Sequence, residues 1–137
     1  MALSVTSWPQ SFASRVVYDD AVGTTVNSNC TGSTGVIQMV IVDNTEGDQE
    51  VFLKMKDGIS ATVSDEPDWL IRTASGKIGT VLLNSCGDFS GGLSFWACRN
   101  ATVGDSTAPS VTTNGTVKVT IIVEQTSNRI NNSSAGY

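Results

Sequence analysis

The chain of 137 residues contains no histidine. This absence excludes Ser-His-Asp and Cys-His nucleophile sites, and also zinc held by histidine. Three cysteines are too few for a zinc site built from four thiolates. No glycine motif that cradles phosphate follows a strand and opens a helix. The residue types that do most protein chemistry are therefore missing or isolated.

Basic residues are also scarce. Lys and Arg number 8 against 13 Asp and Glu, which gives a net charge of −5. A nucleic-acid surface needs a basic patch that displaces counterions from phosphate, so we expect no nucleic-acid partner. No run of 18 apolar residues is present, and residues 1–12 lack the basic start of a signal peptide. We expect no membrane association, and synthesis in a host cytoplasm.

The three cysteines, Cys30, Cys86 and Cys98, form an odd set that argues against a complete disulfide framework. In a reducing compartment we expect them to be small buried thiols. The alternative is that Cys86 and Cys98, which flank a glycine-rich turn, face each other on adjacent strands.

Carboxylates are the remaining candidates for chemistry. Asp65, Glu66 and Asp68 crowd one loop around Pro67. A calcium site needs six to eight oxygens, but this spacing is not that of an EF-hand loop, so we expect a solvated turn with calcium as the alternative. A chain of this length has little room for a lined substrate cleft. We therefore expect no catalytic residues, no metal, no cofactor and no enzymatic activity.

The chain does contain short segments in which apolar and polar residues alternate, separated by turn residues. Asp57-Gly58 and several Gly-rich stretches mark the turns, and no segment of helical period is visible. This pattern predicts an all-β fold, a small antiparallel β-sandwich or jelly roll with about seven or eight strands. The expected strands cover residues 15–18, 23–26, 36–42, 51–56, 69–72, 78–83, 93–98 and 117–124.

The period of two assigns faces to these strands. The almost wholly apolar segment 36–42 is typical of a strand covered on both faces. In residues 117–124 the exception to the alternation is Ile122, which lies on the polar side. We expect these residues to point inward: Val51, Leu53, Met55, Val117, Val119, Ile121 and Val123.

Three parts are expected along the chain. Residues 1–14 form a polar N-terminal arm, residues 15–124 the β-sandwich domain, and residues 125–137 a polar C-terminal tail rich in Ser and Asn. The arm carries Trp8 and Phe12, residue types that often anchor interfaces. We predict that these two side chains dock on a partner, with packing against their own domain as the alternative.

The segment Val51–Cys98, about a third of the chain, resembles small structural proteins of tailed bacteriophages. In that pattern an apolar-x-Leu-Lys-x-aromatic strand leads into Asp or Asn, a Thr-Val-Gly loop and a Pro. An apolar strand, an Ala-Gly turn, a further strand and a Gly-Leu-Ser/Trp-x-Ala strand follow. This chain departs from it at Lys56, where an aromatic is usual, at Ser64, where Gly is usual, and at Ser75, which is inserted in the turn. The matching residues are Phe52, Leu53, Lys54, Asp57, Thr62, Val63, Pro67, Leu70, Ile71, Ala74, Gly76, Phe89, Gly92, Leu93, Ser94 and Ala97.

The resemblance implies a virion protein, with capsid decoration (cement) as the leading function. Such a protein would bind the major capsid protein or other virion subunits on the capsid surface, as a homo-oligomer such as a trimer. A neck, tail or head-fibre component is the alternative within the virion.

A carbohydrate-binding or adhesion module is the alternative from another class. It would use Trp8, Trp69 and Trp96 to stack on sugars. Tryptophan in an alternating strand more often packs in a core or interface, so we expect packing here.

Overall fold

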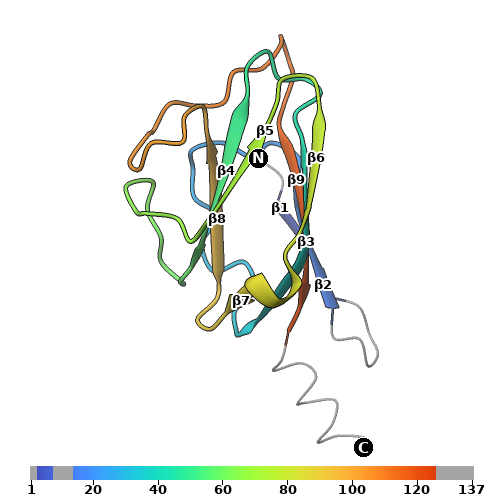
Figure 1. The fold of residues 1–137 in the computed structure, drawn as a ribbon, viewed down its shortest axis with the longest axis vertical. Coiled ribbons are helices and arrows are strands. Elements are labelled where there is room, and N and C mark those ends of the chain that lie inside the picture. Colours follow the sequence, from blue (N-terminus) through green and yellow to red (C-terminus); the bar gives the residue numbers. More distant parts are fainter. Residues whose placement is uncertain (1–2, 8–13, 126–137) are drawn as a thin grey trace, which may run out of the picture.

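The computed structural model describes residues 3–7 and 14–125, which form two antiparallel β-sheets packed face to face (Figure 1). The predicted all-β sandwich is confirmed. The described residues form nine strands rather than seven or eight. The two additional strands are one within the segment assigned to the arm and a two-residue strand at positions 88–89.

The larger sheet, sheet A, has the order β1-β2-β9-β3-β6, and β7 also pairs with β3. All of these pairs are antiparallel. A register shift between Ile37 and Met39 marks a β-bulge in β3. The strands of sheet A are β1 (Leu3–Ser7), β2 (Ser14–Asp19), β3 (Gly35–Asp43), β6 (Ile78–Leu82), β7 (Asp88–Phe89) and β9 (Lys118–Glu124).

The smaller sheet, sheet B, has the order β5-β4-β8, and both of its pairs are antiparallel. A short 3-10 helix, η1 (Asn84–Cys86), joins β6 to β7. The strands of sheet B are β4 (Val51–Asp57), β5 (Trp69–Thr73) and β8 (Leu93–Cys98).

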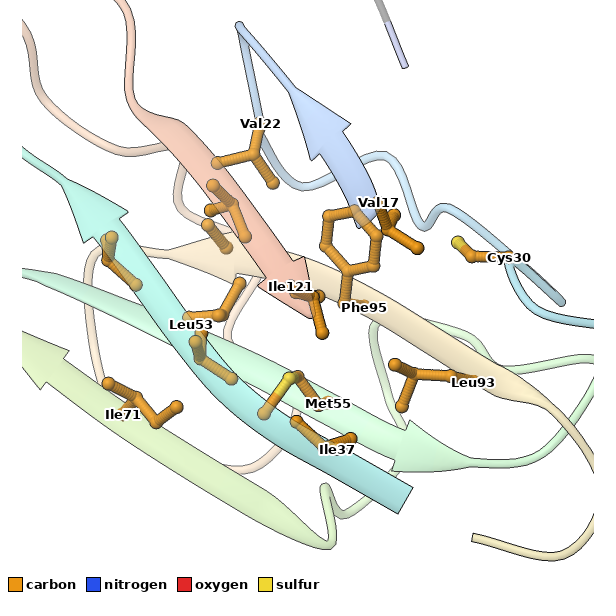
Figure 2. Close-up of a cluster of buried hydrophobic side chains, with 14 of the residues drawn as sticks. Val17, Val22, Cys30, Ile37, Leu53, Met55, Ile71, Leu93, Phe95 and Ile121 are labelled. Atoms are coloured by element: carbon orange, nitrogen blue, oxygen red, sulfur yellow. The ribbon is translucent and has the colours of Figure 1, made fainter. Parts of the chain in front are cut away.

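The hydrophobic core lies between the sheets and follows the predicted alternation (Figure 2). All seven residues expected to point inward on β4, on β9 and at position 117 are buried. Burying each large aliphatic side chain contributes about 1.5–3 kcal/mol, so the sandwich is held mainly by these contacts. The side chains labelled in Figure 2 are Val17, Val22, Cys30, Ile37, Leu53, Met55, Ile71, Leu93, Phe95 and Ile121.

The expected strand at residues 23–26 is absent. The segment instead follows the free edge of β8 irregularly: Ala97 N–H donates to Gly23 O at 2.8 Å, and Asn27 N–H donates to Phe95 O at 2.9 Å. These bonds cover one edge of sheet B without forming a regular ladder, because only the Asn27–Phe95 bridge has strand pairing.

The cysteine prediction is right for two of the three residues. Cys30 and Cys98 are buried, whereas Cys86 lies exposed in η1, and all three are free thiols. Burial and then the charge of Asp19 raise the pKa of Cys30 to about 12. A thiol with so high a pKa stays protonated and is a poor nucleophile at neutral pH.

Candidate interaction surface

The outer face of sheet A is unusually apolar for a surface. Strand register places Val16, Ile122, Met39 and Leu82 in one row across β2, β9, β3 and β6. The next row is Tyr18, Thr120, Ile41 and Thr80. We define the apolar face as Val16, Tyr18, Val36, Met39, Ile41, Ile78, Leu82 and Ile122.

None of these eight residues is buried. Ile78 is 58% exposed and Leu82 is 64% exposed, while the other six are partly buried by their neighbours on the sheet. The prediction that residues 36–42 are covered on both faces is therefore wrong. The strand is apolar on both sides, but only its inner side packs in the core.

The outer face of sheet B is covered over β8 and the middle of β4, while the edge strand β5 keeps Leu70 and Arg72 exposed. Figure 1 shows loops of residues 58–68 and 99–117 on that side of the sandwich. Ala61, Trp96 and Cys98 form a second small hydrophobic cluster there, joined by Val26 and Val63. Only sheet A therefore keeps an open apolar face among the described residues.

A fully buried lysine, Lys54, lies beside the second cluster, since it pairs across the strands with Trp96. Lys54 Nζ donates to Thr102 O at 2.7 Å, which ties β4 to the covering loop. Burial raises the pKa of Cys98, with the ammonium of Lys54 opposing that shift, and the thiol donates to Asp105 O at 3.0 Å. The arrangement fixes a loop in place and leaves no activated thiolate.

An open polar cleft of about 460 Å³ lies at the C-terminal end of β4, beside Lys56 and Asp57. Its carboxylates brace loops: Asp57 accepts from the N–H groups of Ser90 and Gly91, each at 3.0 Å. Asp68 Oδ2 accepts from Asp57 N–H at 2.7 Å. Asp65, which does not line the cleft, accepts from Thr62 N–H at 2.9 Å. In residues 3–7 and 14–125 no group of three His, Cys, Asp or Glu could hold a metal ion.

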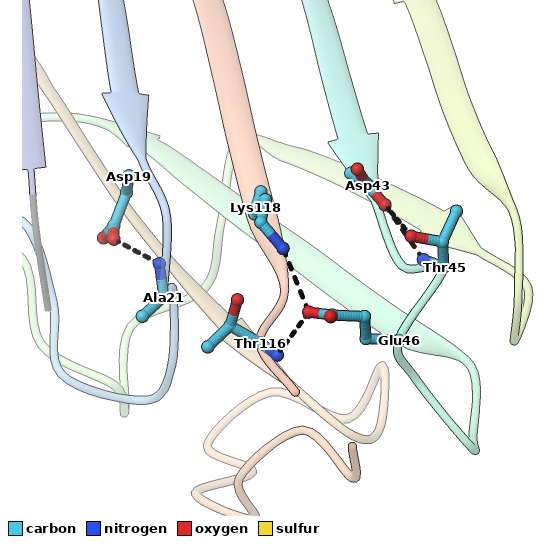
Figure 3. Close-up of polar contacts among 7 residues, drawn as sticks. All are labelled: Asp19, Ala21, Asp43, Thr45, Glu46, Thr116 and Lys118. Carbon is cyan, nitrogen blue, oxygen red and sulfur yellow. Dashed lines mark hydrogen bonds and ion pairs between the residues drawn. The ribbon is translucent and has the colours of Figure 1, made fainter. Parts of the chain in front are cut away.

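Polar contacts border one end of the apolar face, where β9 begins (Figure 3). Glu46 Oε1 accepts from Lys118 Nζ and from Thr116 N–H, each at 3.0 Å. Asp43 accepts from Thr45 N–H at 3.0 Å at the end of β3. The backbone bond from Thr116, followed by Lys118, holds the pKa of Glu46 below its ordinary value of 4.5.

Acid should weaken this contact. A carboxylate whose pKa is lower in the folded chain stabilises the fold above its ordinary pKa and loses that contribution as pH falls through the lower folded value. We expect Glu46→Gln to reduce the acid sensitivity of the thermal midpoint below about pH 4.5, measured by circular dichroism. Glu66→Gln, an exposed change outside this contact, is the control. Equal acid sensitivity in wild type and Glu46→Gln would contradict the assignment.

The predicted docking residues Trp8 and Phe12 lie outside the described residues, and they stay predictions. Trp96 is fully buried, and Trp69 is partly buried with Nε1 donating to Cys86 O at 2.9 Å. Both tryptophans pack as expected, so the described residues offer no platform of exposed indole rings.

Comparisons with protein-family models, curated proteins and solved structures find no significant match. Among the described residues no helix is long and apolar enough to cross a membrane.

Proposed function

We propose that this chain is a structural protein of a tailed-bacteriophage virion, most specifically a capsid decoration protein. The observation that carries the proposal is the apolar face of sheet A, which the described residues leave uncovered. Six residues of this face are partly exposed and Ile78 and Leu82 are largely exposed, and an apolar patch of this kind is often a protein interaction site. The resemblance of Val51–Cys98 to phage structural proteins supports capsid subunits as the partner class.

The mechanism is mechanical and involves no catalysis. The chain would sit on the outer capsid surface as a homo-oligomer and bury apolar side chains across neighbouring capsid subunits. Four strands spaced about 4.8 Å apart and roughly six residues long give a face of about 400 Å². A standard interface buries about 800 Å² on each partner, so a second contact must supplement this face. The predicted anchors Trp8 and Phe12 are candidates for it.

The net charge of −5 fits this function. A protein with an open apolar face stays dispersed more readily when like charges repel its copies. No nucleic acid, membrane or cofactor enters the proposal. A neck, tail or head-fibre position is the alternative within the virion.

Immunogold labelling of intact particles from the source virus tests the location directly. Label spread evenly over the heads would support decoration. Label confined to the neck, tail or fibres would move the protein to the alternative position. No label on particles, with an antibody that recognises unfolded and folded protein, would count against a virion role and make glycan screening the next step.

The apolar face itself is tested by one charge placed at its centre. We expect Ile122→Glu to leave the chain folded and to abolish co-sedimentation with capsid shells that lack the protein, because a carboxylate would have to be desolvated at the contact. Ile59→Glu is the matched control, since Ile59 is 59% exposed in a loop away from sheet A. Undiminished shell binding by folded Ile122→Glu would exclude this face as the docking surface.

A further inference from the structure

Strand β6 is an open edge of sheet A. Among the strands that the structure describes it pairs only with β3, and in Figure 1 it lies at the upper right of the sandwich. Lys77 O accepts from Asn44 N–H at 2.9 Å, and Leu83 N–H donates to Gln38 O at 3.1 Å, so these residues face β3. Because successive residues of a strand point their polar groups to alternate sides, Ile78, Thr80 and Leu82 direct N–H and C=O away from the sheet.

This edge lacks the features that usually protect a strand from pairing. Residues 78–82 include no charged residue and no proline, and Ile78 and Leu82 are both largely exposed. Sheet B is different: Arg72 on its edge strand β5 forms an ion pair with Glu50, and the other edge is covered by residues 23–30. Natural edge strands usually carry charge, proline or a bulge, so β6 is exposed for pairing.

We propose that β6 pairs antiparallel with β6 of a second copy of this chain, about a twofold axis through Thr80. This register places Ile78 opposite Leu82 of the second copy, and Thr80 opposite Thr80. The residues whose main-chain groups point outward then meet one another in three pairs. Each such pair exchanges two hydrogen bonds, which gives about six across the axis.

A second copy of this chain is the expected partner because β6 is complementary to itself. A twofold axis at Thr80 sets aliphatic side chains opposite aliphatic side chains and threonine opposite threonine, both favourable cross-strand pairs. The charged residue next to the strand in sequence, Lys77, directly precedes Ile78, so the two copies of Lys77 lie at opposite ends of the contact. An isologous contact of this kind closes as a dimer.

The other edge strand of sheet A, β1, is not complementary to itself in this way. Pairing β1 with itself about Val5 would set Leu3 opposite Ser7. Pairing β1 of one copy with β6 of another would be heterologous and would propagate into rings or filaments. The symmetric β6 contact is the arrangement in which every outward group of the edge finds an equivalent partner.

The dimer would continue sheet A across both copies, so that their apolar faces lie side by side on one surface. The inference goes beyond the proposed function and does not depend on it. It also predicts a twofold assembly, where the family resemblance implies an oligomer such as a trimer.

Sedimentation velocity over a concentration series tests the contact. We expect the wild type to form dimers, and Thr80→Lys to weaken dimerisation by about tenfold or more, because like charges placed directly opposite each other destabilise a strand pair. Thr80→Pro should act similarly without charge, since the Thr80 N–H is not used in pairing with β3. Thr120→Lys, on the same face but on the central strand β9, is the matched control.

A crosslink tests the register. Residues that face each other as a hydrogen-bonded pair have Cα atoms about 5.5 Å apart, within disulfide range. In a Cys86→Ser background, Thr80→Cys should form a covalent dimer on oxidation, and Thr120→Cys should not. A wild type that stays monomeric up to high concentration would overturn the proposal. A dimer that survives both Thr80→Lys and Thr80→Pro would also overturn it, because another surface would then hold the copies together.

Discussion

Leu53→Ala is expected to lower the free energy of unfolding by about 2–5 kcal/mol. Leu53 is fully buried at the centre of β4, between Ile71 of β5 and Ala97 of β8. Truncation removes apolar contacts and leaves a cavity that the closely packed sheets can fill only in part. Urea unfolding followed by circular dichroism measures the loss as a shift in midpoint at constant slope.

Leu70→Ala is the matched control. Leu70 lies on β5 in the same sheet, but on its outer face, where it is 46% exposed. The same three carbons removed there should cost much less, because most of the side chain already contacts water. Equal losses for the two variants would contradict the face assignment of β4 and β5, and a larger loss for Leu70→Ala would reverse it.

The alternation along β4 and β9 was sufficient to predict their inward faces, because a period of two has one solution when one face is polar. Residues 36–42 were a harder case. Both faces of that strand are apolar, and sequence alone does not distinguish a second covering layer from an open surface. Ile122, which interrupts the polar side of β9, was the signal that the neighbouring strand shares this open face.

The burial of the outer face of sheet B could not be predicted from the sequence for a different reason. Lys54 alternates as a solvent-facing residue should, yet it is fully buried because residues of distant loops pack over it. Such covering depends on contacts far apart in the chain, to which a local pattern does not respond. Cys86 was also misjudged: it was expected to be buried, and it lies exposed in η1.

The sequence predicted that the chain docks on a partner, but it did not predict which surface does so. Aromatic residues of the arm suggested docking, but Trp8 and Phe12 lie outside the described residues. The apolar face came from strand order, because β2, β9, β3 and β6 are neighbours in space but not in sequence. Local turn signals identify hairpins, and they do not specify which distant strands pair.

A second large effect is expected at Asn44, which ties the two sheets together. It follows β3 of sheet A, and its Nδ2 lies within hydrogen-bond distance of Gln49 O at 2.9 Å, Ala74 O at 3.2 Å and Thr73 O at 3.3 Å. Thr73 is the last residue of β5 in sheet B. The packing is tight as well, since a Cβ at Gly47 would lie 1.9 Å from Asn44 Oδ1.

We expect Asn44→Ala to lower the free energy of unfolding by about 2–4 kcal/mol, because it leaves buried carbonyl groups without their donor. Asn44→Asp should cost more at pH 7, since a buried carboxylate would face those carbonyl oxygens without a compensating charge. Burial raises the pKa of such a group, so its extra cost is present above the ordinary aspartate pKa and fades in more acidic solution. Unfolding titrations at several pH values, each compared with wild type, measure both effects.

The control for this pair is Asn114→Asp. Asn114 is exposed in a loop and has a φ of 62°, a conformation that Asp also tolerates, so its change should stay within about 0.5 kcal/mol. If Asn44→Asp were no more costly than Asn114→Asp at pH 7, the amide would not be joining the sheets, and the hydrophobic core alone would have to account for their alignment. A cost that instead falls with acidification would assign the effect to the buried charge, because the loss of a donor alone does not depend on pH.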